Sequence, residues 1–532
     1  MKNAENCKKL YFISENFNYC FYFLQKTIHL RSKNNKTKKH MSIWKTKPLS
    51  VLLNEASEDE KGLKRTLSAK SLVALGVGAI IGAGLFSLTG IAAADNAGPA
   101  VTLSFILAAV GCAFAGLCYA EFASMIPVAG SAYTYSYATM GEFVAWIIGW
   151  DLVLEYALGA ATVAVSWSQY VDKFLGNYGI HIPQSILHGP WDTTPGIINL
   201  PSILIICLLS VLLIRGTKES ALINNILVIL KVTVVIVFIA LGWGFMNSAN
   251  HTPFIPVNEG EALLSSGKMS FLNFFSSDYF GHYGWSGILR GAGVVFFAFI
   301  GFDAVSTAAQ EAKDPQKGMP IGILGSLIIC TILYVLFAFV LTGLENYLNF
   351  KGDASPVTTA FAKTGYTFLN SALTIAIIAG YTSVMLVMLM GQSRVFYSMS
   401  VDGLLPKFFS TLHTRNRTPY KTNLLFMVFV SLFAGFVPVS DLGHMVSIGT
   451  LFAFSLVCIG VIVMRKSNPD AVRGFRVPFV PLFPIIGVLI CLVLMAGLPI
   501  ESWERLAIWM VLGVVIYFLY SKKNSKLNNP EK

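Results

Sequence analysis

The feature that most constrains this 532-residue chain is a series of apolar runs, each long enough to cross a lipid bilayer. A helix rises 1.5 Å per residue, so about 20 apolar residues span a hydrocarbon layer of ~30 Å. We predict twelve such spans, at residues 72–94, 99–120, 140–172, 198–215, 221–246, 287–311, 320–344, 367–399, 421–439, 443–465, 480–499 and 503–520. Charged residues make up only 13% of the chain, whereas soluble domains carry about 25%. The predicted fold class is an all-α membrane protein.

The first span carries four glycines between Gly76 and Gly84, a composition that weakens a membrane helix. Each glycine costs roughly 1 kcal/mol relative to Ala in a helix interior. Close packing through the Gly78-x-x-x-Gly82 spacing is one explanation. We favour a break at Gly82-Ala83-Gly84, which frees backbone groups in mid-membrane where they line a site. The second half-helix would then direct its positive N-terminal end at an anion such as a carboxylate.

A second interruption lies in the stretch from Phe297 to Asp303, within the apolar run at residues 291–309. Gly301 stands in mid-span and an ionisable Asp303 follows it two residues later. Five predicted spans start with the first break and five start with the second. Paired interruptions at corresponding positions of two halves are the best sequence indication of a transporter's binding site. The pair therefore indicates a transporter.

The net charge of +11 does not indicate nucleic-acid binding, because most of it lies in one tail. Residues 1–70 hold 15 Lys and Arg against 6 Asp and Glu, which accounts for nine of the eleven net positive charges. Between residues 71 and 523, fifteen Lys and Arg fall on the side of the termini and six on the other face. By the positive-inside rule, both termini are expected to be cytoplasmic, in a multi-pass protein of the cell membrane.

We expect three parts in the chain: a basic cytoplasmic tail at 1–70, a transporter domain at 71–520 and a C-terminal tail at 521–532. Residues 1–40 are rich in Asn, Lys, Tyr and Phe, and Met41 opens a more ordinary leader. Our hypothesis is that residues 1–40 are dispensable sequence read through to an earlier start codon. The mass of the expressed protein tests it.

Several motifs in this order resemble one family of membrane proteins. They are the Gly-rich first span, Tyr119–Tyr135, Phe297–Asp303 with Glu311–Pro315, Gly391–Arg394 leading into Asp402–Pro406, and Arg473–Pro478. Over residues 64–520 the chain resembles the amino acid–polyamine–organocation superfamily of permeases, in its bacterial cationic-amino-acid-transporter-like branch. This resemblance implies a five-plus-five inverted repeat with broken helices one and six, followed by two C-terminal helices. It also implies amino acid substrates, exchanged or driven by protons.

The resemblance places the substrate carboxylate on backbone N–H groups of Ala83 and Gly84, with Gly82 permitting the turn. Relatives often carry Thr or Ser at the position of Ala83. Ala83 lacks that hydroxyl group, so a side-chain hydrogen bond to the substrate at this position is in doubt. The expected hydrogen bonds from backbone amides do not depend on it.

The same resemblance places the substrate amine on the carbonyl groups of Ile80, Phe297 and Ile300. Its side chain would occupy an apolar pocket that includes Ile80, Phe297, Phe302 and Met388. Met residues are more commonly filler in an apolar core, so the Met388 assignment rests on the family position. We expect broad, neutral amino acid substrates, with Arg and Lys as the alternative that the branch name suggests.

Lys231, Asp303 and Glu155 are ionisable residues within predicted spans, where a charge costs ~3 kcal/mol or more. Lys231 has about ten mostly apolar residues on each side, too far for its ammonium to reach the interface. A structural ion pair is the other explanation, and we favour proton coupling because relatives place this lysine against the broken first span. Asp303 is a second proton-coupling candidate, with capping of the broken helix as the alternative. For Glu155 we expect a helix–helix hydrogen bond.

The function that we predict is secondary active, proton-coupled symport of amino acids by alternating access. An amino acid or polyamine exchanger and a non-transporting amino acid sensor are the alternatives. An intramembrane enzyme is disfavoured, because the sequence has no His-Glu-x-x-His or Gly-x-Ser-x-Gly motif. We predict no catalytic residue, no metal, no cofactor besides the proton and no nucleic-acid partner. The substrate and the lipid bilayer are the expected partners.

Overall fold

The computed structural model describes residues 42–52, 67–128, 130–192, 194–215, 220–259, 269–274, 280–353, 355–413 and 418–529. The chain divides into two compact units, Met1–Ser42 and Ile43–Lys532, and the described helices from α3 onward belong to the second. The segment 1–40, which we predict to be dispensable, lies outside the described residues.

Within the described residues the secondary structure is helical, apart from two isolated bridges that pair Leu67 with Ala312 and Ser270 with Pro499. The longer helices are α5 (Val101–Met125), α7 (Glu142–Gly176), α9 (Leu200–Arg215), α10 (Ser220–Gly242), α14 (Pro315–Leu344), α16 (Thr367–Val401), α17 (Tyr420–Phe436), α18 (Val439–Ser467), α19 (Leu482–Gly497) and α20 (Ile500–Ile516). The shorter ones are α3 (Ala69–Ile80), α4 (Thr89–Ala92), α6 (Ser131–Thr139), α8 (Gln184–Leu187), α12 (Gly284–Val295), α13 (Ala304–Thr307), α15 (Pro356–Phe361) and α21 (Lys522–Asn524).

Eight helical segments in the described part of the chain are long and apolar enough to cross a membrane, and four further apolar helices have 10–17 residues. A helix lies in each of the twelve predicted ranges, and most ends differ from the predicted ones by a few residues. The all-helical class is therefore confirmed. The number of crossings and the inverted repeat stay predictions.

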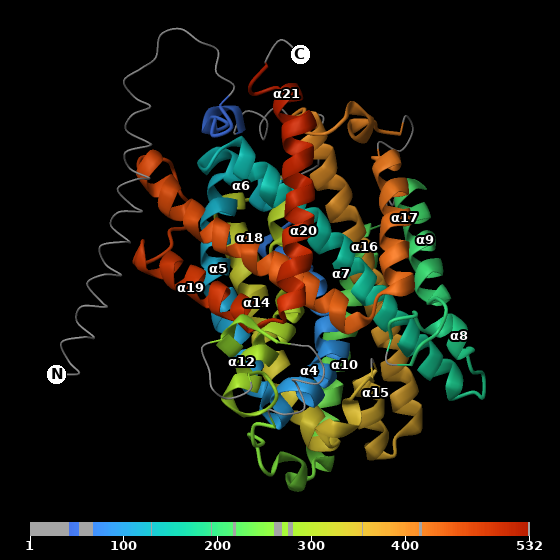
Figure 1. Cartoon of the computed structure of the whole chain (residues 1–532). Coiled ribbons are helices and arrows are strands. Elements are labelled where there is room, and N and C mark those ends of the chain that lie inside the picture. The colour runs from blue at the N-terminus through green and yellow to red at the C-terminus, as the bar shows by residue number, and fades with distance from the viewer. Residues whose placement is uncertain are drawn as a thin grey trace, which may run out of the picture. The chain divides into compact units, whose positions relative to one another are not determined.

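The helix α7 forms the centre of the second unit, where Figure 1 draws it in teal among α16, α18 and α20. Its side chains are buried without interruption from Ile148 to Ser166, as expected for a helix that is apolar on all sides. It packs against α16 and α18, and α9 and α17 cover it further along. A separate group is formed by α14, which packs against α5 and α3.

Both ends of the second unit meet at the first turn of α7. The carbonyl of Lys45 accepts a hydrogen bond from the amide of Glu142 at 3.0 Å. The Glu142 carboxylate accepts hydrogen bonds from Tyr517 Oη and Asn528 Nδ2, both at 3.1 Å, and from the Ser525 hydroxyl. These contacts fasten an N-terminal and a C-terminal segment to the same helix end.

Candidate substrate site at two broken helices

The first break follows α3, which Ser68 caps by accepting a hydrogen bond from the amide of Ser71 at 3.2 Å. The helix ends at Ile80, and Ile81 has extended backbone with φ −72° and ψ 106°. A π-helical segment, η2 (Gly84–Leu88), then resumes the helix. The non-helical residues are thus Ile81 and Gly82, at the start of the stretch where we predict the break. This position is set by glycines that weaken the helix.

The amide groups after this break are available to a ligand. Leu85 and Phe86 both donate to the carbonyl of Gly82, at 3.1 and 3.2 Å. No described residue accepts a hydrogen bond from the amides of Gly82, Ala83 or Gly84. Buried amides of this kind are rarely left without a partner, and at a helix N-terminus they bind anions.

The second break follows α12 and a 3₁₀ turn, η8 (Phe296–Phe299). Ile300 is extended, with φ −60° and ψ 136°, and its amide donates to the carbonyl of Phe297 at 3.2 Å. Gly301 has φ +114°, a backbone region that residues with a Cβ atom rarely adopt. The helix resumes at α13, so the sequence correctly located this interruption.

The two breaks touch each other although more than 200 residues separate them in the sequence. A Cβ atom on Gly84 would lie 2.2 Å from Ala298 Cα, and one on Gly301 would lie 2.9 Å from the Ala79 carbonyl. Tyr334 of α14 bridges the breaks, since its hydroxyl lies 2.9 Å from the Ile80 carbonyl oxygen and 3.0 Å from that of Ala298. The backbone groups proposed to bind the amine and the carboxylate are therefore neighbours.

Lys231 of α10 reaches the first broken helix. Its Nζ atom donates a hydrogen bond to the carbonyl oxygen of Gly78 at 2.8 Å, and the side chain is 1% exposed. The aliphatic part lies against Gly380 of α16, where a Cβ atom would approach it to 3.1 Å. The structure thus places a buried amino group one turn before the break.

Asp303 lies directly after the second break and is fully buried. One of its oxygens, Oδ2, accepts a hydrogen bond from the Tyr156 hydroxyl at 2.8 Å, and the other has no partner among the described residues. Glu155 precedes Tyr156 on α7, and Asp151 lies one turn earlier on the same face. Glu155 thus lies between two other buried carboxyl groups and interacts electrostatically with both, with Asp303 at the second break and with Asp151 against Gly449 of α18.

The hydrogen bond that we expect for Glu155 is not found. Neither Glu155 oxygen nor either Asp151 oxygen has a partner in the part of the chain that the structure describes. Thr450 of α18 lies beside Glu155, but its hydroxyl donates to the carbonyl of Val446 at 3.0 Å. Local competition by a backbone carbonyl thus removes the donor that Glu155 would need.

The other predicted site residues divide between a cavity and the surrounding core. Met388 of α16 lines a cavity of about 30 Å³ next to both breaks, together with Ala79 and Gly301. Phe302 instead packs edge-on against Tyr119, with ring centroids 5.5 Å apart. Its assignment to the side-chain pocket stays a prediction.

Similarity to known proteins identifies the family. A family model described as amino acid permease matches residues 67–517. The chain belongs to the amino acid permease family. The resemblance to the amino acid–polyamine–organocation superfamily is thereby confirmed, and with the apolar helices it makes the chain a multi-pass membrane protein and a transporter rather than an enzyme.

Individual relatives match 77–92% of this chain. The methylthioribose transporter of Bacillus subtilis (strain 168) is 42% identical over 488 residues, 92% of this chain and 99% of that protein. The branched-chain amino acid permease BcaP of the same organism is 44% identical over 489 residues, with the same coverage. The vacuolar cationic amino acid transporter 4 of Arabidopsis thaliana is 37% identical over 413 residues, 77% of this chain and 65% of that protein.

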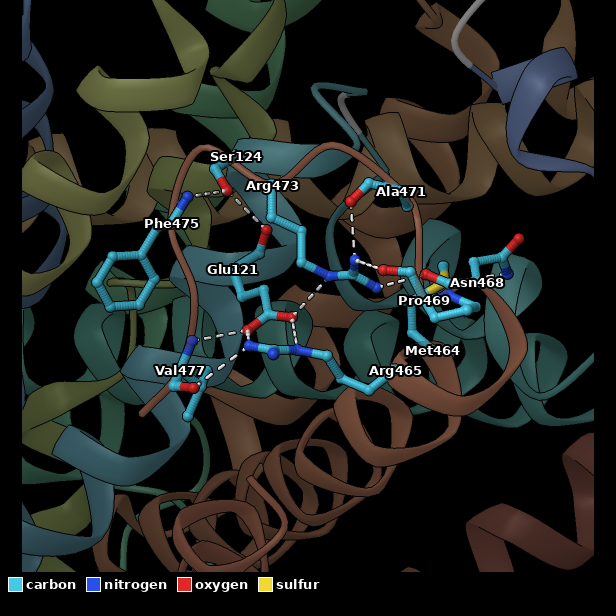
Figure 2. A network of polar contacts seen from close by, with 10 residues as sticks. All are labelled: Glu121, Ser124, Met464, Arg465, Asn468, Pro469, Ala471, Arg473, Phe475 and Val477. Atoms are coloured by element: carbon cyan, nitrogen blue, oxygen red, sulfur yellow. Dashed lines mark hydrogen bonds and ion pairs between the residues drawn. The ribbon is translucent and has the colours of Figure 1, made fainter. Parts of the chain in front are cut away.

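A separate polar network of this permease shows what a fully paired buried carboxylate looks like (Figure 2). Glu121 of α5 accepts two hydrogen bonds from Arg465 of α18, both at 2.7 Å, and one from the Val477 amide at 2.7 Å. Arg473 Nε lies 3.2 Å from the same carboxylate. The network fixes the loop at 468–481 against α5 and has no contact with the cavity.

Sequence reasoning missed two tyrosines of the site, Tyr334 and Tyr156, and a buried carboxyl group near it, Asp151. Each lies within a predicted span, where a buried polar group must find a partner or a function. Asp151 could have been found from its i, i+4 relation to Glu155, which puts both carboxyl groups on one helix face. No comparable signal in the sequence marks either tyrosine as a partner of the breaks.

Proposed function

We propose that this permease is a proton-coupled symporter of neutral amino acids that works by alternating access across twelve transmembrane helices. In this proposal both termini are cytoplasmic, the cell membrane is its location and the fold is a five-plus-five inverted repeat. The observation that carries the proposal is the hydrogen bond from Lys231 to the Gly78 carbonyl, which ties a buried titratable group to the broken first helix.

The coupling works through this hydrogen bond. A charged lysine gives a charge-assisted bond that holds α3 in place, and proton loss weakens the bond and releases α3. Asp303 acts beside the second break, where its carboxyl group gains or loses a proton as the amino acid arrives and leaves. The geometry supports this role, because Asp303 has one oxygen without a described partner.

The substrate binds to backbone groups of the two breaks. The amides of Ala83 and Gly84 receive the carboxylate, Gly82 allows the turn, and the amine meets the carbonyl groups of Ile80 and Phe297 together with that of Ile300. Tyr334 already donates to the Ile80 carbonyl, whose second lone pair remains for the amine. Backbone recognition of this kind accepts many side chains.

The substrate class is neutral and branched or broad. Two relatives are named branched-chain amino acid permeases, at 44% and 35% identity. Val384 and Met388 give the cavity an apolar wall. The competing substrates are cationic amino acids and methylthioribose, after which other relatives are named.

The test uses the full chain in liposomes. Uptake of leucine, alanine, arginine and methylthioribose is measured with and without an inward proton gradient, for the wild type and for Lys231→Ala. The control is Lys363→Ala, which removes a lysine that is 56% exposed. Gradient-driven accumulation of leucine or alanine that is lost only in Lys231→Ala supports the proposal.

Other outcomes favour the alternatives. Arginine uptake that is independent of the gradient and intact in Lys231→Ala overturns both the coupling residue and the neutral substrate. Counterflow without gradient-driven accumulation identifies an amino acid exchanger. Counterflow of a polyamine in the same assay identifies a polyamine exchanger. Binding without flux identifies a sensor.

A further inference from the structure

The cavity beside the broken helices lies to one side of them. Its wall includes Ala79, which precedes the first break, and Ala304 and Thr307, which follow the second. The half-helices that form this wall are α3 and α13, while α12 and η2 lie beyond the breaks. The cavity is therefore between the binding backbone and the end of the protein at which α3 begins.

Opposite α3 and α13, the cavity is closed by α16, which contributes Met388 and Arg394 to its wall. Arg394 comes six residues after Met388, about 9 Å further along the helix. The two side chains thus mark a near and a far position along one path away from the breaks.

Arg394 is a cation without a fixed partner in the described part of the chain. No described residue accepts a hydrogen bond from its guanidinium group, and no ion pair within 4.0 Å is formed by it there. Glu311 acts on Arg394 electrostatically from outside that distance. An arginine with this freedom has all five N–H donors available to a planar anion.

A carboxyl group lies behind the cavity wall, one hydrogen bond away from it. Tyr156 forms part of the wall, and its hydroxyl is hydrogen-bonded to the Asp303 carboxyl group at 2.8 Å. The cavity thus has a guanidinium group in its wall and, behind Tyr156, a carboxyl group, which are the two groups that complement a zwitterion. The guanidinium group would take the carboxylate, and the Asp303 side would take the amine.

We propose that Arg394 is a second binding station for the carboxylate of the transported amino acid, on the α3 and α13 side of the breaks. The inference rests on the proposed function, since it assigns a step to an amino acid that has left the backbone site. Arg394 receives the carboxylate as the amides of Ala83 and Gly84 release it. The same positive charge disfavours substrates with a cationic side chain on this path.

The present conformation closes this station. The cavity offers water-sized probes about 30 Å³, enough for a few water molecules at roughly 10–15 Å³ each and too little for an amino acid. The substrate reaches Arg394 only when α3 and α13 separate from α16. Because this movement opens the cavity toward one face of the membrane, loss of Arg394 should change the KM for substrate on that face more than on the other.

The experiment compares the two faces for the full-length protein. Initial rates of leucine transport are measured in intact cells and in inverted vesicles of one expression strain, for the wild type, Arg394→Gln and Arg394→Lys. With Arg394→Gln, the KM for leucine on the face of the termini rises about 10-fold, which corresponds to the loss of one charge-assisted hydrogen bond. The KM on the opposite face changes less than about 2-fold. Arg394→Lys recovers part of the loss, because it keeps the charge.

The matched variant is Glu311→Gln, which removes the acidic group that acts on Arg394. Equal KM changes on both faces, no change in either KM, or a Glu311→Gln variant that reproduces the Arg394→Gln effect would overturn the station. A KM change confined to the opposite face keeps the station and reverses the proposed orientation of the termini. If Arg394→Gln does not fold, Arg394→Lys decides alone, by the presence or absence of a one-sided KM change.

Failure of the proposed function looks different. If the wild type transports neither leucine nor alanine from either face, the proposed substrate class is wrong, and Arg394 has not yet been tested. Transport that is normal in the wild type and symmetric in Arg394→Gln rejects the station only.

Discussion

Two buried carboxylate groups of this permease have opposite surroundings. Glu121 is 2% exposed at its side chain and is paired with Arg465, Arg473 and a backbone amide. Glu155 is equally buried, and within the described residues its oxygens have no hydrogen-bond partner. A paired network holds a loop in one place, whereas an unpaired carboxyl group is costly unless it is protonated or meets a ligand. The first group has a structural role that its contacts explain, and the contacts of the second do not explain its burial.

The largest effect is expected for Asp303→Asn, which keeps the shape of the side chain and removes its titration. Gradient-driven accumulation in liposomes should fall to background, while the yield of folded protein stays unchanged. Tyr156→Phe is the matched variant, since it removes one hydrogen bond and leaves the carboxyl group, at a cost of about 5-fold in rate. Accumulation that persists in Asp303→Asn would place proton coupling elsewhere.

The next effect concerns stability and contrasts Glu121→Gln with Glu155→Gln. Removing the charge of Glu121 leaves Arg465 and the buried Arg473 without their anion, which should cost about 2–4 kcal/mol. Glu155→Gln removes no partner and should cost at most about 1 kcal/mol. Thermal unfolding of the two purified variants measures the contrast. Equal losses of stability would mean that Glu155 has a structural partner as well.

A smaller effect is expected from the apolar wall of the cavity. Met388→Ala enlarges the space beside the breaks and should lower the KM for phenylalanine about 5-fold relative to that for alanine. Met399→Ala is the control, because Met399 lies on the same helix but packs against Gly149, away from the cavity. If both variants change the ratio equally, Met388 does not face the substrate.

The smallest effect concerns Glu345, a paired carboxylate at the end of α14. Burial alone would raise its pKa, but hydrogen bonds from Asn349, Lys363 and the Asn346 amide outweigh burial and hold the pKa below its usual value. A depressed pKa stabilises the fold above the unfolded value of about 4.3, and this contribution is lost as the pH falls through the folded pKa.

Glu345→Gln should therefore lower the melting temperature at pH 7 by a small amount and leave it unchanged at pH 3. The loss is limited to about 1 kcal/mol, because the Lys363 partner is half exposed. Lys363→Ala should show part of the same pH dependence. If Glu345→Gln lowers the melting temperature equally at pH 7 and pH 3, the charge of the carboxylate is not the source of the stabilisation.

The sequence allowed the two breaks to be located, because glycine composition acts locally on helix stability. Gly82 marks the first break and Gly301, with its positive φ, marks the second. Lys231 was equally accessible to prediction, since a lysine between apolar residues must have a reason to be there. These are features of single segments.

What depends on segments far apart in the chain could not be predicted. The contact of Gly84 with Ala298 and the bridge made by Tyr334 arise only when α14 packs across both breaks. The rule that buried polar groups are paired led to a hydrogen bond for Glu155, and the actual packing provides none among the described residues. An unmet local rule at a buried site is itself an indication of function.

The fastening of the segments around Lys45 and Ser525 to Glu142 has a practical consequence for protein engineering. A fluorescent fusion or purification tag joined before residue 43 leaves the Lys45 contact intact, whereas a C-terminal truncation that removes Ser525 and Asn528 strips two donors from this carboxylate. The shortest expression boundaries that keep every one of these contacts run from residue 45 to residue 528.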